Sequence, residues 1–224
     1  MTHVCKFCSK GFGSERTLSV HMCVKKKRWA ERDTIGSRIG FRVFQRFYEL
    51  TTQSKKPKTQ EDFIESKFYA DFVKFGRHLV RLNPINADAF IDFVIKNGVK
   101  LSQWGEDFVY DTFLEDFMKT ESAEAALERT ILEMQDWATE NKKEYFNFFR
   151  EVNANEATFL IRAGRISPWV LYLAPSADEL FTRLSYEQGK IINTVIDPAR
   201  WQARFMLKKD DVKFVTTILE EAGL

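Results

Sequence analysis

The sequence predicts an all-α fold, in which a multi-helix globular body follows a small N-terminal ββα element. Apolar residues recur at helical spacing from residue 35 onwards, and capping residues, glycines and prolines separate these runs. No stretch shows the alternating pattern with Asn-Gly turns that a larger sheet needs. The 224 residues are 44% hydrophobic and include 21 Phe, so the chain has enough apolar surface to build a core.

The N-terminal element carries a metal-binding pattern. Cys5 and Cys8 form a C-x2-C pair, and Phe12, Leu18 and His21 follow at the spacing of the two-cysteine, two-histidine zinc finger, which this segment resembles. The resemblance implies a hairpin closed by the cysteine pair, a core of the Phe and the Leu, and a helix that delivers the histidine. All three cysteines lie between positions 5 and 23, which suits metal ligation in a reducing compartment better than a disulfide framework. We therefore expect one Zn²⁺ ion.

The fourth ligand departs from the family pattern. Lysines occupy the positions where the second histidine would follow His21, and the nearest suitable donor is Cys23. Residues two apart diverge on a helix, so the helix must end near His21 for Cys23 to turn back to the metal. His3, before the first cysteine, is the weaker alternative. The predicted ligands are Cys5, Cys8, His21 and Cys23.

The helix of the finger is poorly suited to reading DNA bases. The resemblance places Ser14, Thr17 and Val20 towards the major groove, with Arg16 beside them. Serine and threonine read bases ambiguously and valine reads almost nothing. Sequence-specific recognition by this finger alone is not expected, and contact with phosphates or with another protein stays open.

A strongly basic segment follows the finger. Residues 1–60 hold 14 Lys/Arg against 4 Asp/Glu, whereas the rest of the chain has 20 against 28. A helix over 35–50 would align three arginines along one edge and would place Ile39, Val43, Phe47 and Leu50 on the side that packs. Phosphates could lie across from such cations, but so could carboxylates of the same chain, and Trp29 could stack a base or dock on the body. The candidate nucleic-acid contacts are Arg16, Lys25, Lys26, Lys27, Arg28, Trp29, Arg38, Arg42 and Arg46.

The rest of the chain is predicted to be a series of helices. Residues 51–60 are polar, contain Pro57 and mark a boundary, which gives a finger (1–24), a basic connector with an amphipathic helix (25–60) and an acidic helical body (61–224). Short helices are expected to begin at Ser167-Pro168 and at a Ser176/Glu179 capping box. The other predicted helices span 61–82, 87–97, 102–118, 122–140, 142–152, 156–163, 187–196, 198–207 and 210–222.

The sequence offers no catalytic constellation, and we do not expect an enzyme. His78 is the one histidine after residue 21, and it lies in an apolar helix without a matching nucleophile. Neighbouring acids such as Glu106/Asp107 diverge on a helix, and no phosphate-binding glycine loop is present. The absence of a signal-type segment and of 18 consecutive apolar residues leads us to expect a cytoplasmic protein with no membrane partner.

Several stretches, CKFCSKGFGSERTLSVHMCVKKKRW, RIGFRVFQRFYEL and ISPWVLYL, resemble uncharacterised zinc-finger proteins of large tailed bacteriophages. That resemblance implies a phage protein in the host cytoplasm, acting in replication, transcription or host takeover. Two functions fit. The first is a non-enzymatic accessory protein that contacts nucleic-acid phosphates while its body binds a protein of the replication or transcription machinery. The alternative is a zinc-stapled adaptor, inhibitor or virion-associated protein that binds an acidic protein surface and no nucleic acid.

Overall fold

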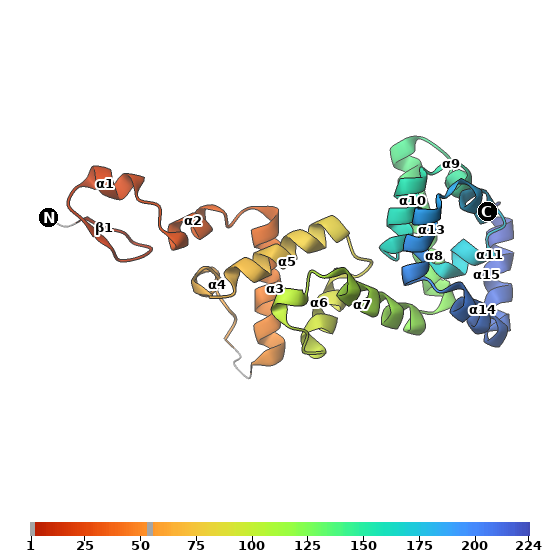
Figure 1. Cartoon of the computed structure of the whole chain (residues 1–224), viewed down its shortest axis with the longest axis horizontal. Helices are drawn as coiled ribbons and strands as arrows, with labels where there is room; N and C mark the ends of the chain where they lie inside the picture. Colours follow the sequence, from red (N-terminus) through yellow and green to blue (C-terminus); the bar gives the residue numbers. More distant parts are fainter. Residues whose placement is uncertain (1–2, 53–55) are drawn as a thin grey trace. The chain divides into compact units, whose positions relative to one another are not determined.

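Helices make up nearly all the regular structure, as the sequence predicts. A computed structural model describes residues 3–52 and 56–224. Across these residues it contains fifteen α-helices, two short 3₁₀ helices and one two-stranded antiparallel sheet (Figure 1). The chain divides into a first unit, Met1–Val109, and a second unit, Tyr110–Leu224.

The first unit contains the finger and the helices that follow it. Its division from the second unit differs from the boundary after residue 60 that composition suggests, because α3 packs against both α5 and α6. The elements are β1 (His3–Val4), β2 (Gly11–Phe12), α1 (Glu15–Val20), α2 (Val24–Ala30), α3 (Ile35–Thr51), α4 (Gln60–Glu65), α5 (Tyr69–Leu82), α6 (Ala87–Lys96), η1 (Leu101–Gln103) and the start of α7 (Asp107–Thr120).

The predicted run 61–82 is two helices, not one. The chain bends between α4 and α5, where Ser66 leaves the helical conformation (φ −58°, ψ 134°) and the N–H of Phe68 donates to the Ser66 hydroxyl. The bend lets Phe63 and Ile64 of α4 and Tyr69 of α5 all be buried. Helical periodicity continues through the bend, so the local pattern could not reveal it.

Three glycines allow α3 and α5 to cross at close range. A Cβ atom added to Gly76 of α5 would lie 2.5 Å from the carbonyl oxygen of Gly36 and 2.7 Å from the nitrogen of Gly40, both in α3. A Cβ at Gly40 would lie 2.8 Å from the carbonyl oxygen of Phe72. The two backbones therefore touch at a crossing that has no room for a side chain.

An aromatic core fills the space beside this crossing. Phe44 of α3 lies edge-on to Phe72 of α5 with ring centroids 5.4 Å apart, and Trp104 after η1 packs on Phe75 at 5.2 Å. The Trp104 indole N–H donates to the carbonyl of Val99, so this buried ring leaves no polar atom unpaired. These contacts hold α3 and α5, which follow the finger in sequence, in one packed arrangement.

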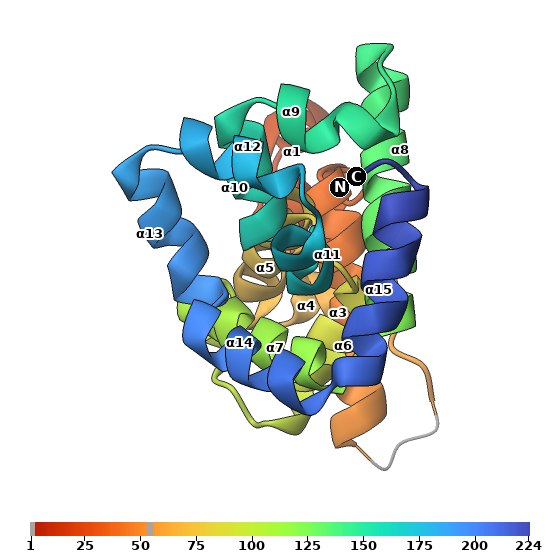
Figure 2. The ribbon, with the colours of Figure 1, turned by 90° about the vertical axis from the view of Figure 1, so that its right-hand side faces the viewer.

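The second unit is built around α11 (Pro168–Leu173), the segment that begins at the predicted Ser167-Pro168 start. Trp169, Val170 and Leu171 are buried, and Figure 2 shows α11 inside the unit, where it contacts α8, α12 and α15. The surrounding elements are α8 (Ala123–Asn141), η2 (Tyr145–Asn147), α9 (Phe148–Glu151), α10 (Ala154–Arg162), α12 (Ala177–Arg183), α13 (Tyr186–Val195), α14 (Pro198–Leu207) and α15 (Lys209–Glu221).

The predicted helix boundaries are confirmed in part. Asn86 and Ser122 cap α6 and α8 with their side chains, and Gly98 and Gly164 have the positive φ values of helix ends. The predicted helix 142–152 is wrong, because its residues form η2 and the single turn of α9.

The Ser176/Glu179 capping box is also wrong. Ser176 has helical backbone angles, φ −68° and ψ −15°, instead of the extended ones that aim a capping hydroxyl at the helix N–H groups. Its buried hydroxyl has no hydrogen-bond partner, and the carboxylate of Glu179 pairs with Arg150. The serine therefore begins α12 without capping it.

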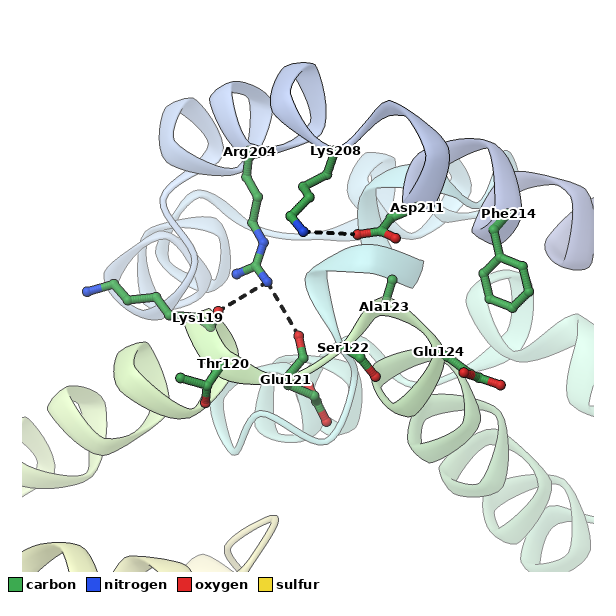
Figure 3. A pocket seen from close by; sticks show the side chains of 10 residues that line it. All are labelled: Lys119, Thr120, Glu121, Ser122, Ala123, Glu124, Arg204, Lys208, Asp211 and Phe214. Atoms are coloured by element: carbon green, nitrogen blue, oxygen red, sulfur yellow. Dashed lines mark hydrogen bonds and ion pairs between the residues drawn. The ribbon is translucent and has the colours of Figure 1, made fainter.

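Four arginines donate hydrogen bonds to backbone carbonyls at the ends of helices that lie far from them in sequence. Arg204 of α14 donates to the carbonyl of Met118 at 2.7 Å and reaches the carbonyls of Lys119 and Glu121 at the end of α7, where it spans a pocket of about 550 Å³ (Figure 3). Guanidinium groups likewise bind carbonyls at the ends of α4, α9 and α10. These arginine clasps are Arg28, Arg129, Arg183 and Arg204.

No helix in the described part of the chain combines the length and the apolar character needed to cross a bilayer.

Candidate metal centre and basic surface

Four side chains of the finger converge on one point, as their spacing predicts. The ligand atoms of Cys5, Cys8, His21 and Cys23 all lie within 4.8 Å of one another, and Cys8 Sγ is 3.3 Å from His21 Nε2. No other such group of four occurs within the described residues. His3 lies on β1 outside the cluster, so the structure favours Cys23 as the fourth ligand.

A short hairpin positions the first two cysteines. β1 and β2 pair antiparallel, with His3 opposite Phe12. The N–H of Cys5 donates to the carbonyl of Lys10, and the N–H of Ser9 donates to the carbonyl of Cys5. This turn encloses Cys8 and presents both sulfurs to one side. A hydrogen bond from the backbone N–H of Phe7 lowers the pKa of the Cys5 thiol, which favours the thiolate that binds metals.

The segment between α1 and α2 positions the other two ligands. α1 ends at Val20, and both His21 and Cys23 have extended backbone angles, so their side chains face the same way. This confirms the helix end that a His-x-Cys pair requires. Cys23 also caps α2, because its Sγ accepts a hydrogen bond from the N–H of Lys26 at 3.4 Å.

Three sulfurs and one imidazole nitrogen complete a four-ligand set suited to a tetrahedral metal ion. Four protein ligands around a tetrahedral ion would leave no open position for substrate or water, as in structural metal sites. The Phe12 ring packs on the imidazole of His21 at 4.6 Å, which restrains the ring of that ligand. The arrangement is compatible with a metal-stabilised finger.

Comparisons of the chain with protein-family models, with curated proteins and with solved structures found no match.

Much of the basic run after the finger is used within the first unit. Arg28 donates to the carbonyls of Ile64 and Ser66, at 2.7 and 3.1 Å, and stacks over Tyr69. Lys25 pairs with Glu65. Helix α2 is therefore fastened to the end of α4.

The remaining residues of the run divide between contact and exposure. The ammonium of Lys26 donates to the carbonyls of Ser19 and His21, at the end of α1. Trp29 packs on Phe7 of the finger, with ring centroids 6.2 Å apart, and is covered by Arg32. Lys27 is exposed, and its Nζ makes a loose ion pair with Glu31 Oε1 at 4.0 Å. The tryptophan thus docks on the finger itself, a partner that the sequence did not suggest.

The arginine edge of α3 is largely paired with carboxylates of the first unit. Arg46 makes two hydrogen bonds of 2.7 Å to Asp92 of α6 and a third to Glu49, and Arg42 pairs with Asp88. This is the intramolecular alternative that the sequence left open. Arg38, the third of the stripe, is exposed. Phosphate contact by Arg42 and Arg46 would have to replace these pairs.

The Arg46–Asp92 pair gives a testable pH dependence. Hydrogen bonds from Arg46 lower the pKa of Asp92 to about 2, against about 3.9 for an unfolded chain. The folded pKa is the lower one, so the stabilisation is complete above about pH 4 and is lost as pH falls through about 2. We expect Arg46→Gln to lower the free energy of unfolding by about 1–2 kcal/mol near neutral pH, allowing for solvent screening.

Urea unfolding of wild type and Arg46→Gln at neutral pH and near pH 2 measures this dependence. The difference between the two proteins should shrink to near zero at the acid end. An equal difference at both pH values would show that the ion pair is not its source.

The base-reading positions of α1 offer little to a nucleic acid. The Ser14 hydroxyl caps α1 by accepting from the N–H of Thr17, and the Thr17 hydroxyl donates to the Ser14 carbonyl. Val20 is 76% exposed and apolar. The expectation that the finger does not read sequence stays a prediction. Sequence analysis missed Lys6 and Lys10, which the hairpin holds exposed on either side of Cys8.

His78 lies in the core of the first unit. It is 5% exposed, its Nδ1 is 3.3 Å from Arg81, and its Nε2 has no hydrogen-bond partner. Burial, reinforced by the charge of Arg81, lowers the pKa of this imidazole and keeps it neutral. The side chain packs against Gly105, which is consistent with a structural histidine.

Proposed function

We propose that this protein is a non-enzymatic zinc-finger protein that contacts nucleic-acid phosphates through the exposed cations of its finger and of helix α2. The observation that supports it is the charge of residues 3–30, which hold seven Lys/Arg and one Glu. Of these cations, Lys6, Lys10, Arg16 and Lys27 are exposed. Such a cluster attracts a polyanion without requiring base contacts.

Zinc is the proposed metal. Three thiolates and one imidazole are ligands that bind zinc in structural sites. Magnesium and calcium prefer oxygen ligands and are not expected to bind this set. The ion would supply the folding energy of the finger and no chemistry. It would thereby fix the positions of the cations that the hairpin and α1 carry.

The resemblance to phage zinc-finger proteins supports a role beside the replication or transcription machinery, with the second unit as the part that binds a protein. The adaptor alternative also has an observation in its favour. Arg28, Arg42 and Arg46 are already bound within the first unit, which removes part of the charge that a nucleic acid would use. The two functions differ in whether the finger binds DNA at all.

A salt series with labelled duplex DNA tests the proposal. We expect the triple variant Lys6→Gln/Lys10→Gln/Arg16→Gln to lose affinity for every duplex alike and to flatten the plot of log K against log salt by about two to three units. All three side chains are exposed, so the variant should stay folded and keep its metal.

The matched control is Arg42→Gln/Arg46→Gln, which removes two arginines from ion pairs with α6. This variant should be less stable but should keep the wild-type salt slope. Should wild type fail to bind DNA at about 50 mM salt, where backbone contacts are strong, the adaptor function would replace the proposal.

A further inference from the structure

Three exposed apolar side chains, here called the apolar strip, alternate in sequence with two of the metal ligands of the finger. The strip consists of Val20, Met22 and Val24, which are 76%, 61% and 65% exposed. His21 and Cys23 alternate with these residues and turn inwards to the metal cluster. In an extended segment successive side chains point to opposite sides, so ligation of 21 and 23 directs Met22 outwards.

Positive charge borders this strip from both helices. Arg16 precedes Val20 by four residues on α1 and shares its face, and Lys27 follows Val24 by three on α2. Lys26 folds back so that its ammonium lies 3.0 Å from the carbonyl of His21. No acidic residue occurs between Glu15 and Glu31. The surface therefore combines an apolar centre with a basic border.

We propose that the apolar strip is a docking surface for an acidic peptide segment of a partner protein, one that carries apolar side chains along one face and Asp or Glu beside them. The apolar face would cover the strip, and the carboxylates would meet Arg16, Lys26 and Lys27. This goes beyond phosphate contact, because valine and methionine give a phosphate no hydrogen bond.

The composition of the strip favours a protein over a lipid surface. Side chains that enter a membrane interface are typically Trp, Phe and Leu, which the strip lacks. Methionine, by contrast, is common on protein surfaces that adapt to peptide partners, because its side chain is flexible and polarisable. The metal cluster holds the backbone of the strip, so little ordering is needed when a peptide binds.

Methyl NMR of the full-length, zinc-loaded protein tests the docking surface. The probe is a synthetic amphipathic helix of about four turns with Leu on one face and Glu beside it, and its control has Lys in place of every Glu. We expect the methyl signals of Val20, Met22 and Val24 to shift with the acidic peptide only. The signal of Met206, a methionine of the second unit with 65% exposure, should not move.

Substitution of Met22 then tests the contribution of the apolar strip to peptide binding. Met22→Ser should weaken binding of the acidic peptide about tenfold, whereas Met206→Ser should leave it unchanged. Zinc content checks that Met22→Ser is folded. The salt-dependent DNA binding of Met22→Ser should equal that of wild type, so a failure of phosphate contact and a failure of the docking surface give different results.

Three outcomes would overturn the proposal. The first is an absence of methyl shifts at millimolar acidic peptide. The second is a preference of the strip for anionic phosphatidylglycerol vesicles, which would make it a membrane surface. The third is a shift of the three methyl signals with duplex DNA that Met22→Ser abolishes, which would make the strip part of the nucleic-acid contact.

Discussion

Replacing Gly76 by alanine is expected to destabilise the first unit by about 3 kcal/mol or more. The added Cβ would lie 2.5 Å from the carbonyl oxygen of Gly36 and 2.7 Å from the nitrogen of Gly40, and both are backbone atoms that cannot rotate away. Helices α3 and α5 would have to separate, which would also loosen the contact between Phe44 and Phe72. Denaturant unfolding of Gly76→Ala against wild type measures the loss.

Gly189 provides the matched control for this substitution. It also lies inside a helix, α13, but a Cβ added there would have no neighbour within 4 Å. Gly189→Ala should therefore leave stability unchanged or raise it by up to about 1 kcal/mol, because alanine favours the helix. If both variants were equally stable, the close crossing of α3 and α5 would not exist in solution.

Loss of the metal is expected to unfold the finger while leaving the helices behind it folded. Between residues 3 and 30 only Cys5 is buried, so the finger has almost no core of its own. Zinc binding in such elements supplies about 10–16 kcal/mol at neutral pH, far more than the half-buried Phe12 and Leu18 can. Cys8→Ser should thus release the metal, remove amide-exchange protection from residues 3–24 and retain it in α5.

The fourth ligand is tested by the same metal measurement. Cys23→Ala should lower zinc affinity by about a hundredfold or more, because it removes a direct ligand, whereas His3→Ala should leave it near wild type. The reverse ranking would move the fourth ligand to His3. A zinc content near zero in the reduced wild-type protein would refute the metal site altogether.

The metal ligands could be predicted from the sequence because their geometry is local. Spacing alone identified Cys5, Cys8 and His21, and the helix end after Val20 followed from the demand that Cys23 reach the same point. The partners of the arginine edge could not be predicted this way. Arg46 is 46 residues from Asp92, and nothing in the pattern of either helix indicates which carboxylate meets which cation.

The arrangement of the helices could likewise be predicted only in part from the sequence. The amphipathic pattern of α3 indicated the packed side only in part: of the residues predicted to pack, Val43 is buried, Ile39 and Phe47 are half-buried, and Leu50 is exposed. It did not indicate the crossing of Gly36 and Gly40 with Gly76. The bend after α4 escaped detection because it depends on tertiary contacts of Phe63 and Tyr69. Periodicity reports which side of a helix is apolar, whereas bends and crossings depend on which other helix that side meets.

The Arg204 clasp leaves the second unit incomplete until late in its synthesis. The end of α7 exposes carbonyls at Met118 that the ribosome delivers 86 residues before their donor, Arg204. Until α14 has emerged, those carbonyls depend on water, and Trp169 lacks both the guanidinium above it and the ring of Trp201 beside it. The nascent second unit is therefore unfinished and open to chaperones or proteases until its last two helices appear.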